Sequence, residues 1–427
     1  MYRPVTAIEA RIWGRSVGAV ALDPALGYYA FEYDPDFVRT GIELAPLAMP
    51  LSSAREPFIF TQLPEATFRR LPAMLADALP DDFGNALVDA WMAREGVARD
   101  QVTPLDRLAY MNKRGLGALE FRPARGGTRA SSTAIELSKL VEGARMAVAG
   151  HLGKDDLATA ALAQIIRVGT SAGGARAKAV IAWNPATQEI RAGQFDVPEG
   201  FEHWIIKFDG IGADRELGEG RGHGRIEYAY HLMALAAGIT MAPCRLLEEG
   251  ERAHFMTKRF DRDGHAKHHV QTLCAMAHMD YRQRATHDAS ELFLTMRDLH
   301  LGYEAFEQAF RRIAFNVMAA NCDDHTKNIS FLVRAGGDWE LAPAYDVTHA
   351  YNPKGAWTYQ HLLGVNGKFA VITRHDLLDL AERFGVGTAS AVLAEVRTAV
   401  ASWPGHAEKA GLTEPQTSRI AAHHTPL

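Results

Sequence analysis

Three polar residues between positions 321 and 346 have side chains that suit magnesium and phosphate chemistry. Asp323 and Asn328 are five residues apart, and Asp346 follows a short predicted β-hairpin. Carboxylate and amide oxygens bind Mg2+, and a carboxylate can also accept the proton of an attacking hydroxyl. The alternative interpretation is an Asn/Asp-rich turn before a strand, which needs no catalytic role. This segment alone leaves both interpretations open.

The five-residue spacing equals the Asp-to-Asn spacing in the catalytic loop of protein kinases. In that loop the Asp accepts the proton of the acceptor hydroxyl, the Asn holds a magnesium ion, and a later Asp supplies a second metal contact. Asp324 is one residue too close to Asn328 to be the base. His325 and Lys327 lie inside the loop, where they can contact phosphate or support the loop, and we favour structural support for His325.

A glycine-bearing loop over residues 168–178 precedes an apolar strand at 179–183. It contains the hydroxyls of Thr170 and Ser171 and two cations, Arg176 and Lys178. Successive backbone N–H groups in such a loop can bind an anion, and the cations add attraction. The loop matches neither a P-loop nor a Rossmann fingerprint, so a flexible hairpin connection is an equal alternative.

Lys207 lies in a second apolar strand, predicted over residues 203–208. A lysine in such a strand requires an anionic partner, because an ammonium is costly to remove from water. In a kinase-like lobe that partner is the nucleotide phosphates, and a helix Glu positions the lysine. Glu227 is in the first turn of a helix predicted over 226–237. It can fill this role, although simple complementation of the helix dipole is slightly favoured.

The elements that position these residues are predicted from apolar periodicity and from turn residues. Strands are expected at 7–13, 17–22, 27–33, 244–247, 254–258, 329–333 and 339–341, helices at 71–79, 83–96, 104–110, 290–298, 303–320, 376–384 and 389–401, further helical pattern within 134–166, and a linker at 123–132. Residues after 401 are expected to form a polar tail. His265, His268 and His269 are expected to lie in an exposed polar turn rather than in a metal site.

Composition limits the class of protein. The chain of 427 residues is long enough for two or three domains. Its net charge of -5 argues against DNA binding by the whole surface. The three scattered cysteines form neither a disulfide framework nor a zinc motif. No signal core and no window of ~18 apolar residues is present, so we expect a soluble, cytoplasmic protein without membrane contact.

The order of these features is that of a protein kinase domain, but GxGxxG, HRD, DFG and APE are all absent, which excludes an ordinary eukaryotic-type kinase. The chain instead resembles the HipA family, the kinase toxins of HipBA toxin–antitoxin modules. The resemblance spans most of the chain and rests on the combination of several motifs. These are Leu79-Pro80-Asp81-Asp82-Phe83-Gly84, Ser171-Ala172-Gly173-Gly174-Ala175-Arg176-Ala177-Lys178, Lys258-Arg259-Phe260-Asp261-Arg262, Asn321-x-Asp323-x-His325-x-Lys327-Asn328 and Pro343-x-Tyr345-Asp346.

The resemblance implies ATP and Mg2+ as cofactors and a role for individual residues. Asp323 is then the catalytic base, and Asn328 and Asp346 are the magnesium ligands. The segment 256–260 matches the hinge that holds adenine, and Lys207 matches the lysine that binds the phosphates. Ser171 matches the serine that the family autophosphorylates, with Thr170 as an alternative acceptor. The full set expected to bind ATP is Lys207, Ala172, Gly173, Gly174, Lys178, Met256, Lys258, Phe260 and His325.

The resemblance also implies an α+β fold of the two-lobed, protein-kinase-like (HipA-like) kind. Residues 1–125 are expected to form an N-terminal subdomain that is β-rich and then helical. Residues 126–258 are expected to form a region like a kinase N-lobe, with the glycine-rich loop. Residues 259–427 are expected to form a largely helical C-lobe with the catalytic and metal-binding loops.

By the same resemblance, the chain phosphorylates a translation component, such as glutamyl-tRNA synthetase or another aminoacyl-tRNA synthetase. Autophosphorylation switches it off, and a HipB-like helix-turn-helix antitoxin neutralises it and makes most of the contact with operator DNA. Three alternatives remain: a kinase for a small molecule or lipid headgroup, a silent corepressor that docks an antitoxin, and, with less support, a metal-dependent nuclease. The intact set of Lys207, Asp323, Asn328 and Asp346 argues against the silent protein.

Overall fold

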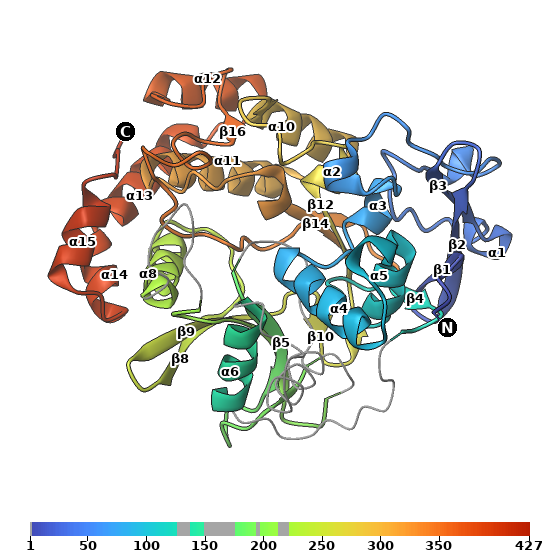
Figure 1. Ribbon diagram of the computed structural model, residues 1–427. Coiled ribbons are helices and arrows are strands. Elements are labelled where there is room, and N and C mark those ends of the chain that lie inside the picture. Colours follow the sequence, from blue (N-terminus) through green and yellow to red (C-terminus); the bar gives the residue numbers. More distant parts are fainter. Residues whose placement is uncertain (1, 126–136, 149–175, 194–196, 212–221) are drawn as a thin grey trace. The chain divides into compact units, whose positions relative to one another are not determined.

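The computed structural model describes residues 2–125, 137–148, 176–193, 197–211 and 222–427 (Figure 1). These residues form two compact units, each built from several stretches of the chain. Unit 1 contains residues 1–212, 258–271 and 332–338, and unit 2 contains residues 213–257, 272–331 and 339–427. Helices and strands occur in both units, which agrees with the predicted α+β class. Within the described ranges, no helix is long and apolar enough to cross a bilayer.

An antiparallel sheet begins unit 1. Its strands are β1 (Ala7–Ile12), β2 (Arg15–Asp23), β3 (Tyr28–Tyr33) and β4 (Glu120–Arg122), in the order β3-β2-β1-β4. The strands predicted at 7–13 and 17–22 pair, but the turn expected at 14–16 lies instead at Trp13 and Gly14, and β2 begins at Arg15. Both turn residues have positive φ angles of 48° and 79°, as a two-residue hairpin turn with the twist of the strands requires.

Among the described residues, five α-helices lie in the chain between β3 and β4, and a sixth follows β4. They are α1 (Pro35–Val38), α2 (Glu65–Phe68), α3 (Ala73–Ala76), α4 (Asp82–Arg94), α5 (Pro104–Met111) and α6 (Leu137–Val148). The helix predicted over 71–79 is only the four-residue α3, because Pro72 disfavours helical backbone at Leu71. The other two predicted helices are confirmed. Asp81 caps α4 by accepting a hydrogen bond from Gly84 N at 2.7 Å, and Thr103 caps α5.

A second group of antiparallel strands in unit 1 contains β5 (Lys178–Trp183), β6 (Ile190–Ala192) and β7 (Glu202–Lys207). Every residue of β5 is buried, and β5 pairs with both β6 and β7. A short hairpin of β10 (Arg262–Asp263) and β11 (Ala266–Lys267) belongs to the same unit. The positions 1, 126–136, 149–175, 194–196 and 212–221 lie outside the described residues, and with them most of the predicted linker and of the glycine-rich loop.

Unit 2 is built mainly from helices around one apolar core. The helices are α8 (His223–Ala236), α9 (Leu273–Met276), α10 (Ala289–Asp298), α11 (Tyr303–Met318), α12 (Arg374–Arg383), α13 (Ala389–Ala401), α14 (Trp403–Lys409) and α15 (Glu414–Ala421). The prediction of a polar tail after residue 401 is wrong. Trp403 and Ile420, in α14 and α15, are fully buried in the core.

Short strands complete the two units. They are β8 (Cys244–Glu249), β9 (Arg252–Lys258), β12 (His269–Thr272), β13 (His287–Asp288), β14 (Ser330–Val333), β15 (Trp339–Leu341) and β16 (Leu363–Gly364). The strands predicted at 244–247 and 254–258 are confirmed, and they pair antiparallel as β8 and β9. Ala342 N donates to Ser330 O at 2.9 Å, which closes the predicted hairpin between Asn328 and Asp346.

Candidate active site

Helix α11 delivers the chain to the loop that contains Asp323 and Asn328. Asn328 lies in a single 3-10 turn, Thr326–Asn328, and its Nδ2 donates to the backbone carbonyl of Asp323 at 2.7 Å. This bond joins the two residues that the sequence predicted to act together. It uses the amide nitrogen of Asn328 and leaves the amide oxygen, the atom that a metal ion requires, out of the contact.

The Asp323 carboxylate is held by the indole of Trp357. Trp357 Nε1 donates to Asp323 Oδ1 at 2.9 Å, and 39% of the Asp323 side chain is still exposed. Burial raises the pKa of Asp323 above its usual value, and the charges of Asp346 and Asp324 raise it further. His325 and the Trp357 hydrogen bond act in the opposite direction. A partly desolvated carboxylate with a raised pKa is a better proton acceptor than a free one.

Asp346 comes near Asp323 from beyond the hairpin, since the two carboxylates interact electrostatically. Its φ angle is 53°, in the left-handed region that side chains other than Asn, Asp and Gly seldom adopt. The preceding residue anchors this turn, because Tyr345 OH donates to Lys327 O at 2.6 Å. The loop 321–328 and the segment after Asp346 are also joined by a parallel bridge between Asn321 and Ala350.

The donor set fits a magnesium ion that is shared with a phosphate. Asn328 and Asp346 offer one amide oxygen and one carboxylate, which are hard oxygen ligands. Mg2+ is commonly held by one or two protein groups, substrate phosphates and water rather than by a cage of side chains. Among the described residues, no group of three or more His, Cys, Asp and Glu side chains is placed to hold a metal ion by itself.

His325 and Lys327 contact one aromatic ring. The rings of His325 and Tyr281 lie 5.2 Å apart, and Lys327 Nζ is 5.1 Å from the centre of the Tyr281 ring. Thr326, between them, donates its hydroxyl proton to Met279 O at 2.8 Å. These contacts attach the loop to the segment 279–281 and favour a supporting role for His325.

Asp324 has a structural role that the sequence did not reveal. It is 6% exposed, and its Oδ1 accepts hydrogen bonds from Leu362 N at 2.7 Å and Leu363 N at 3.3 Å. Its Oδ2 lies 2.8 Å from His361 Nδ1. Burial lowers the pKa of His361, but the charge of Asp324 outweighs burial and raises it to about 10, so the ring is cationic at neutral pH. The pair fixes the backbone directly beside Asp323.

Two of the predicted ATP-binding lysines face each other in unit 1. Lys178 on β5 and Lys207 on β7 are directly opposite, so their side chains lie on the same face of the strands. Lys178 is nearly fully buried, and its Nζ pairs with Asp81 Oδ2 at 3.4 Å. Lys178 is thus an ion-pair partner of the residue that caps α4. The neighbouring predicted residues Thr170, Ser171, Ala172, Gly173 and Gly174 lie outside the described residues.

The predicted hinge residues are split between two environments. Met256 is fully buried within β9, whereas Lys258 Nζ pairs with Glu202 at 2.6 Å and Phe260 is half-buried. Between the last two, Arg259 N donates to His203 O at 2.9 Å, which attaches the segment to β7.

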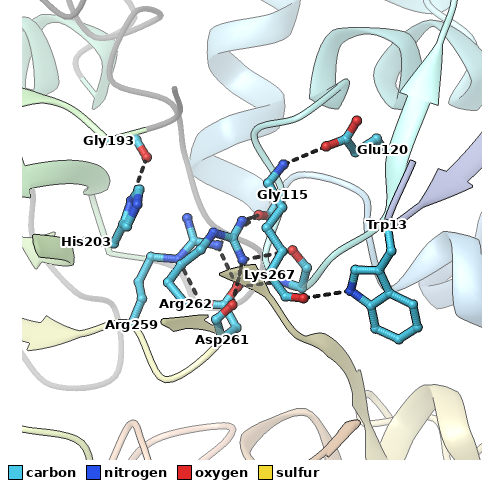
Figure 2. Close-up of polar contacts among 10 residues, drawn as sticks. Trp13, Gly115, Glu120, Gly193, His203, Arg259, Asp261, Arg262 and Lys267 are labelled. Carbon is cyan, nitrogen blue, oxygen red and sulfur yellow. Dashed lines mark hydrogen bonds and ion pairs between the residues drawn. The ribbon is translucent and has the colours of Figure 1, made fainter. Parts of the chain in front are cut away.

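A buried ionic cluster follows directly in the same unit (Figure 2). Asp261 is fully buried and pairs with both Arg259 and Arg262 at 2.6 Å, and it also accepts a hydrogen bond from Gly117 N at 2.7 Å. Arg259 Nη2 donates to Gly115 O at 3.0 Å. The hinge segment is therefore anchored to the loop that precedes β4.

The prediction of an exposed polar turn is wrong for two of its three histidines. His265 is exposed, but His268 and His269 are buried. His269 Nε2 lies 3.2 Å from Leu44 O, and Lys267, beside them, pairs with Glu120 at 2.7 Å and accepts from Trp13 Nε1 through its carbonyl (Figure 2). The turn packs onto N-terminal residues, and its polar groups make hydrogen bonds and an ion pair with groups that are distant in the sequence.

Replacing Lys178 with Met tests whether this lysine serves Asp81. We expect the free energy of unfolding to fall by about 3–5 kcal/mol at pH 8, because Asp81 loses its buried partner. The loss is smaller near pH 5, since burial already raises the pKa of Asp81 to about 6 and the carboxylate can take up a proton. Urea denaturation of the single variants and of Lys178→Met/Asp81→Asn measures the coupling. Full additivity of the two substitutions would contradict the assignment.

Comparisons with known proteins identify the family of this chain. A family model described as the HipA-like C-terminal domain matches residues 170–403, and one described as the HipA N-terminal domain matches residues 8–122. No match was found among curated proteins.

Two solved structures are similar to this chain. One is HipA of Shewanella oneidensis MR-1, solved with HipB and its operator DNA, with a TM-score of 0.68 and 16% identity over 97% of this chain and 94% of that chain. The other is the Helicobacter pylori proinflammatory kinase CtkA, with a TM-score of 0.36 and 12% identity over 52% of this chain and 85% of that chain. The first confirms the HipA-like fold. The C-terminal family model alone covers more than half of the chain, and the chain therefore belongs to the HipA family.

Proposed function

We propose that this protein is a HipA-type toxin that transfers the γ-phosphoryl group of ATP, with Mg2+, to a serine or threonine hydroxyl of a protein. The observation that carries the proposal is the arrangement of Asp323, Asn328 and Asp346. Asn328 is bonded to the backbone of Asp323 at 2.7 Å, and the charge of Asp346 acts on the Asp323 carboxylate. Membership of the HipA family supports the same reaction.

In this mechanism the Asp323 carboxylate orients the acceptor hydroxyl and takes its proton as the new bond from the hydroxyl oxygen to the γ-phosphorus forms. The bond between the γ-phosphorus and the oxygen that bridges it to the β-phosphate breaks, and ADP leaves with that oxygen. Trp357 holds one carboxylate oxygen, which leaves the other to face the acceptor. Asn328 and Asp346 would hold magnesium through an amide and a carboxylate oxygen. When bound, the metal neutralises charge that develops on the transferred phosphoryl group. Asp324 and His361 keep the backbone of the loop in place.

The nucleotide is assigned to residues of unit 1. Lys207 is proposed to bind the phosphates, and the backbone around Lys258 and Phe260 to bind adenine. The Asp261 cluster supports that backbone, because Arg259 and Arg262 hold it to the loop 115–117. Lys178 is a weaker candidate for the phosphates than Lys207, since it already pairs with Asp81.

Regulation and partners are proposed from the family. Ser171, or Thr170 beside it, is the proposed site of autophosphorylation. A phosphate there adds about -1.5 to -2 charges close to Arg176 and Lys178. The proposed partners are a HipB-like antitoxin, operator DNA through that antitoxin, and an aminoacyl-tRNA synthetase as substrate. The similar HipA structure from Shewanella contains both HipB and operator DNA.

Incubation of the dephosphorylated protein with γ-labelled ATP and Mg2+ tests the proposal directly. We expect label on the chain itself, at position 171 or 170, and on one member of a panel of aminoacyl-tRNA synthetases. Addition of EDTA should remove both signals. A protein that labels neither itself nor the panel would refute the kinase assignment. Label on itself but on no synthetase would leave the kinase and refute the substrate class.

A further inference from the structure

The end of helix α11 is capped by residues that are distant in the sequence. A helix leaves its last four carbonyl groups without partners inside the helix. Here Met318 O accepts a hydrogen bond from Thr425 N at 2.9 Å, and Ala319 O accepts one from Tyr230 OH at 2.5 Å. Ala320 O, one residue further, accepts from Ala350 N at 3.2 Å. Three separate segments thus hold the three residues that precede the loop 321–328.

Tyr230 connects two of these segments. It is a fully buried residue of α8, and its hydroxyl also lies 3.0 Å from His424 Nε2. The single hydroxyl proton goes to Ala319 O, because a carbonyl can only accept, so His424 Nε2 must donate to the tyrosine oxygen. Burial, then the neighbouring His423, lowers the pKa of His424 to about 4, so the ring is neutral and can adopt the tautomer this chain of hydrogen bonds requires.

The C-terminal segment that contains His424 also contacts the segment that follows Asp346. His423 Nδ1 lies 2.9 Å from the Nε2 of His349, which is three residues after Asp346. Ala350 O in turn accepts a hydrogen bond from Cys322 N at 3.1 Å. The segment 422–427 therefore contacts the backbone that precedes the loop, at Met318, and the side chain of His349, which follows Asp346.

Residues 318–320, which join α11 to the loop 321–328, need support from other segments because the backbone conformation of Ala320 is unfavourable. Ala320 has a φ angle of 53°, in the left-handed region, although it is not a glycine. Such a residue costs on the order of 1–3 kcal/mol and persists only when surrounding contacts hold it. Tyr230 OH, Thr425 N and Ala350 N supply those contacts at adjacent carbonyls.

We propose that Tyr230 and His424 are positioning residues for the catalytic loop, and that they act through the carbonyl of Ala319 rather than by touching a substrate. The inference rests on the proposed phosphoryl transfer. Loss of the Tyr230 hydroxyl removes the hydrogen bond to Ala319 O, so the backbone of residues 318–320 moves more. The Asp323 carboxylate then spends less time in line with the acceptor hydroxyl. Nucleotide binding is not altered directly, since neither residue is among those assigned to ATP.

The test compares Tyr230→Phe with Tyr228→Phe on the same helix, whose hydroxyl makes no hydrogen bond within the described part of the chain. Tyr230→Phe keeps the packing of the ring against Trp403, at 5.2 Å, and removes only the hydroxyl. We expect kcat to fall roughly tenfold, with KM for ATP changed less than twofold. Amide hydrogen exchange over residues 319–328 should become faster. Tyr228→Phe should behave like the unsubstituted protein.

His424 provides a second variant that keeps the inference falsifiable if Tyr230→Phe folds poorly. His424→Ala should lower kcat and speed exchange, whereas His424→Gln, which can still donate to Tyr230, should restore much of both. Unchanged kcat in Tyr230→Phe and His424→Ala, with faster exchange at 319–328, would overturn the proposal. If the unsubstituted protein transfers no phosphate, the proposed function fails. The exchange measurement then still reports whether these residues hold the loop, so the two failures are distinguishable.

Discussion

Substitution of Asp323 by Asn is expected to lower the rate of phosphoryl transfer by roughly 10²–10⁴-fold, the usual contribution of a general base. The substitution is nearly isosteric. An Asn side-chain oxygen can still accept the hydrogen bond from Trp357 Nε1, and the bond from Asn328 goes to the backbone carbonyl, which is unchanged. The variant should therefore fold normally and still bind ATP. Initial rates with γ-labelled ATP, together with thermal melting and nucleotide titration, measure the three properties separately.

The control for this prediction is Asp338→Asn, which removes one exposed carboxylate from the turn of the following hairpin. It should leave the rate within a factor of about two. The pH profile adds a further check. Because the pKa of Asp323 is raised, the unsubstituted protein should lose activity on the acidic side at a higher pH than an ordinary Asp would give. Phosphoryl transfer that persists undiminished in Asp323→Asn would show that another group is the base.

Local features of the fold could be predicted from the sequence because their causes act within a few residues. The hairpin around Trp13 and Gly14 depends on its own turn, and α5 begins where Thr103 caps it and Pro104 occupies its first position. The helix α11 has a clear apolar stripe. The arrangement of Asp323 and Asn328 is also local, since one hydrogen bond joins the two residues across five positions.

Features that depend on long-range packing could not be predicted in this way. Asp324 and His361 are 37 positions apart, and a sequence gives no sign that a carboxylate will be buried against one particular imidazole. His269 contacts the carbonyl of Leu44, 225 residues earlier, so its neighbourhood of charged residues suggested exposure wrongly. Helices α14 and α15 are too short for a periodic apolar signal, although Trp403 and Ile420 complete the core.

Dependence on long-range packing also explains why the partner of Lys178 could not be predicted. The cost of burying an ammonium predicts an anionic partner for Lys207 in its strand. Lys178 is instead expected in the glycine-bearing loop, whereas the structure places it at the start of β5, where it pairs with Asp81. Sequence alone cannot say that Lys178 finds Asp81, because that contact depends on how α4 packs beside β5. The buried pair of Lys178 and Asp81 could therefore be recognised only in the structure.

Replacement of His361 by Gln is expected to lower the free energy of unfolding by about 3–5 kcal/mol at pH 7. The substitution removes a buried cation and leaves the Asp324 carboxylate, 6% exposed, without its charge partner. The backbone N–H groups of Leu362 and Leu363 still bind that carboxylate, so the fold should survive. Urea denaturation measures the loss. The matched control is His375→Gln, which removes a surface His–Asp pair with Asp379 whose histidine is 83% exposed, and little change is expected there.

The pH dependence separates the ion pair from simple packing. The folded protein raises the pKa of His361 to about 10, above its ordinary value of about 6.5, so the folded state retains a proton that the unfolded state loses between these values. The stability from this pair is complete below pH 6.5 and is lost as the pH rises through 10. The difference between the unsubstituted protein and His361→Gln should therefore narrow steadily from pH 7 to pH 10. A difference that stays constant over this range would mean that His361 acts through its volume rather than its charge.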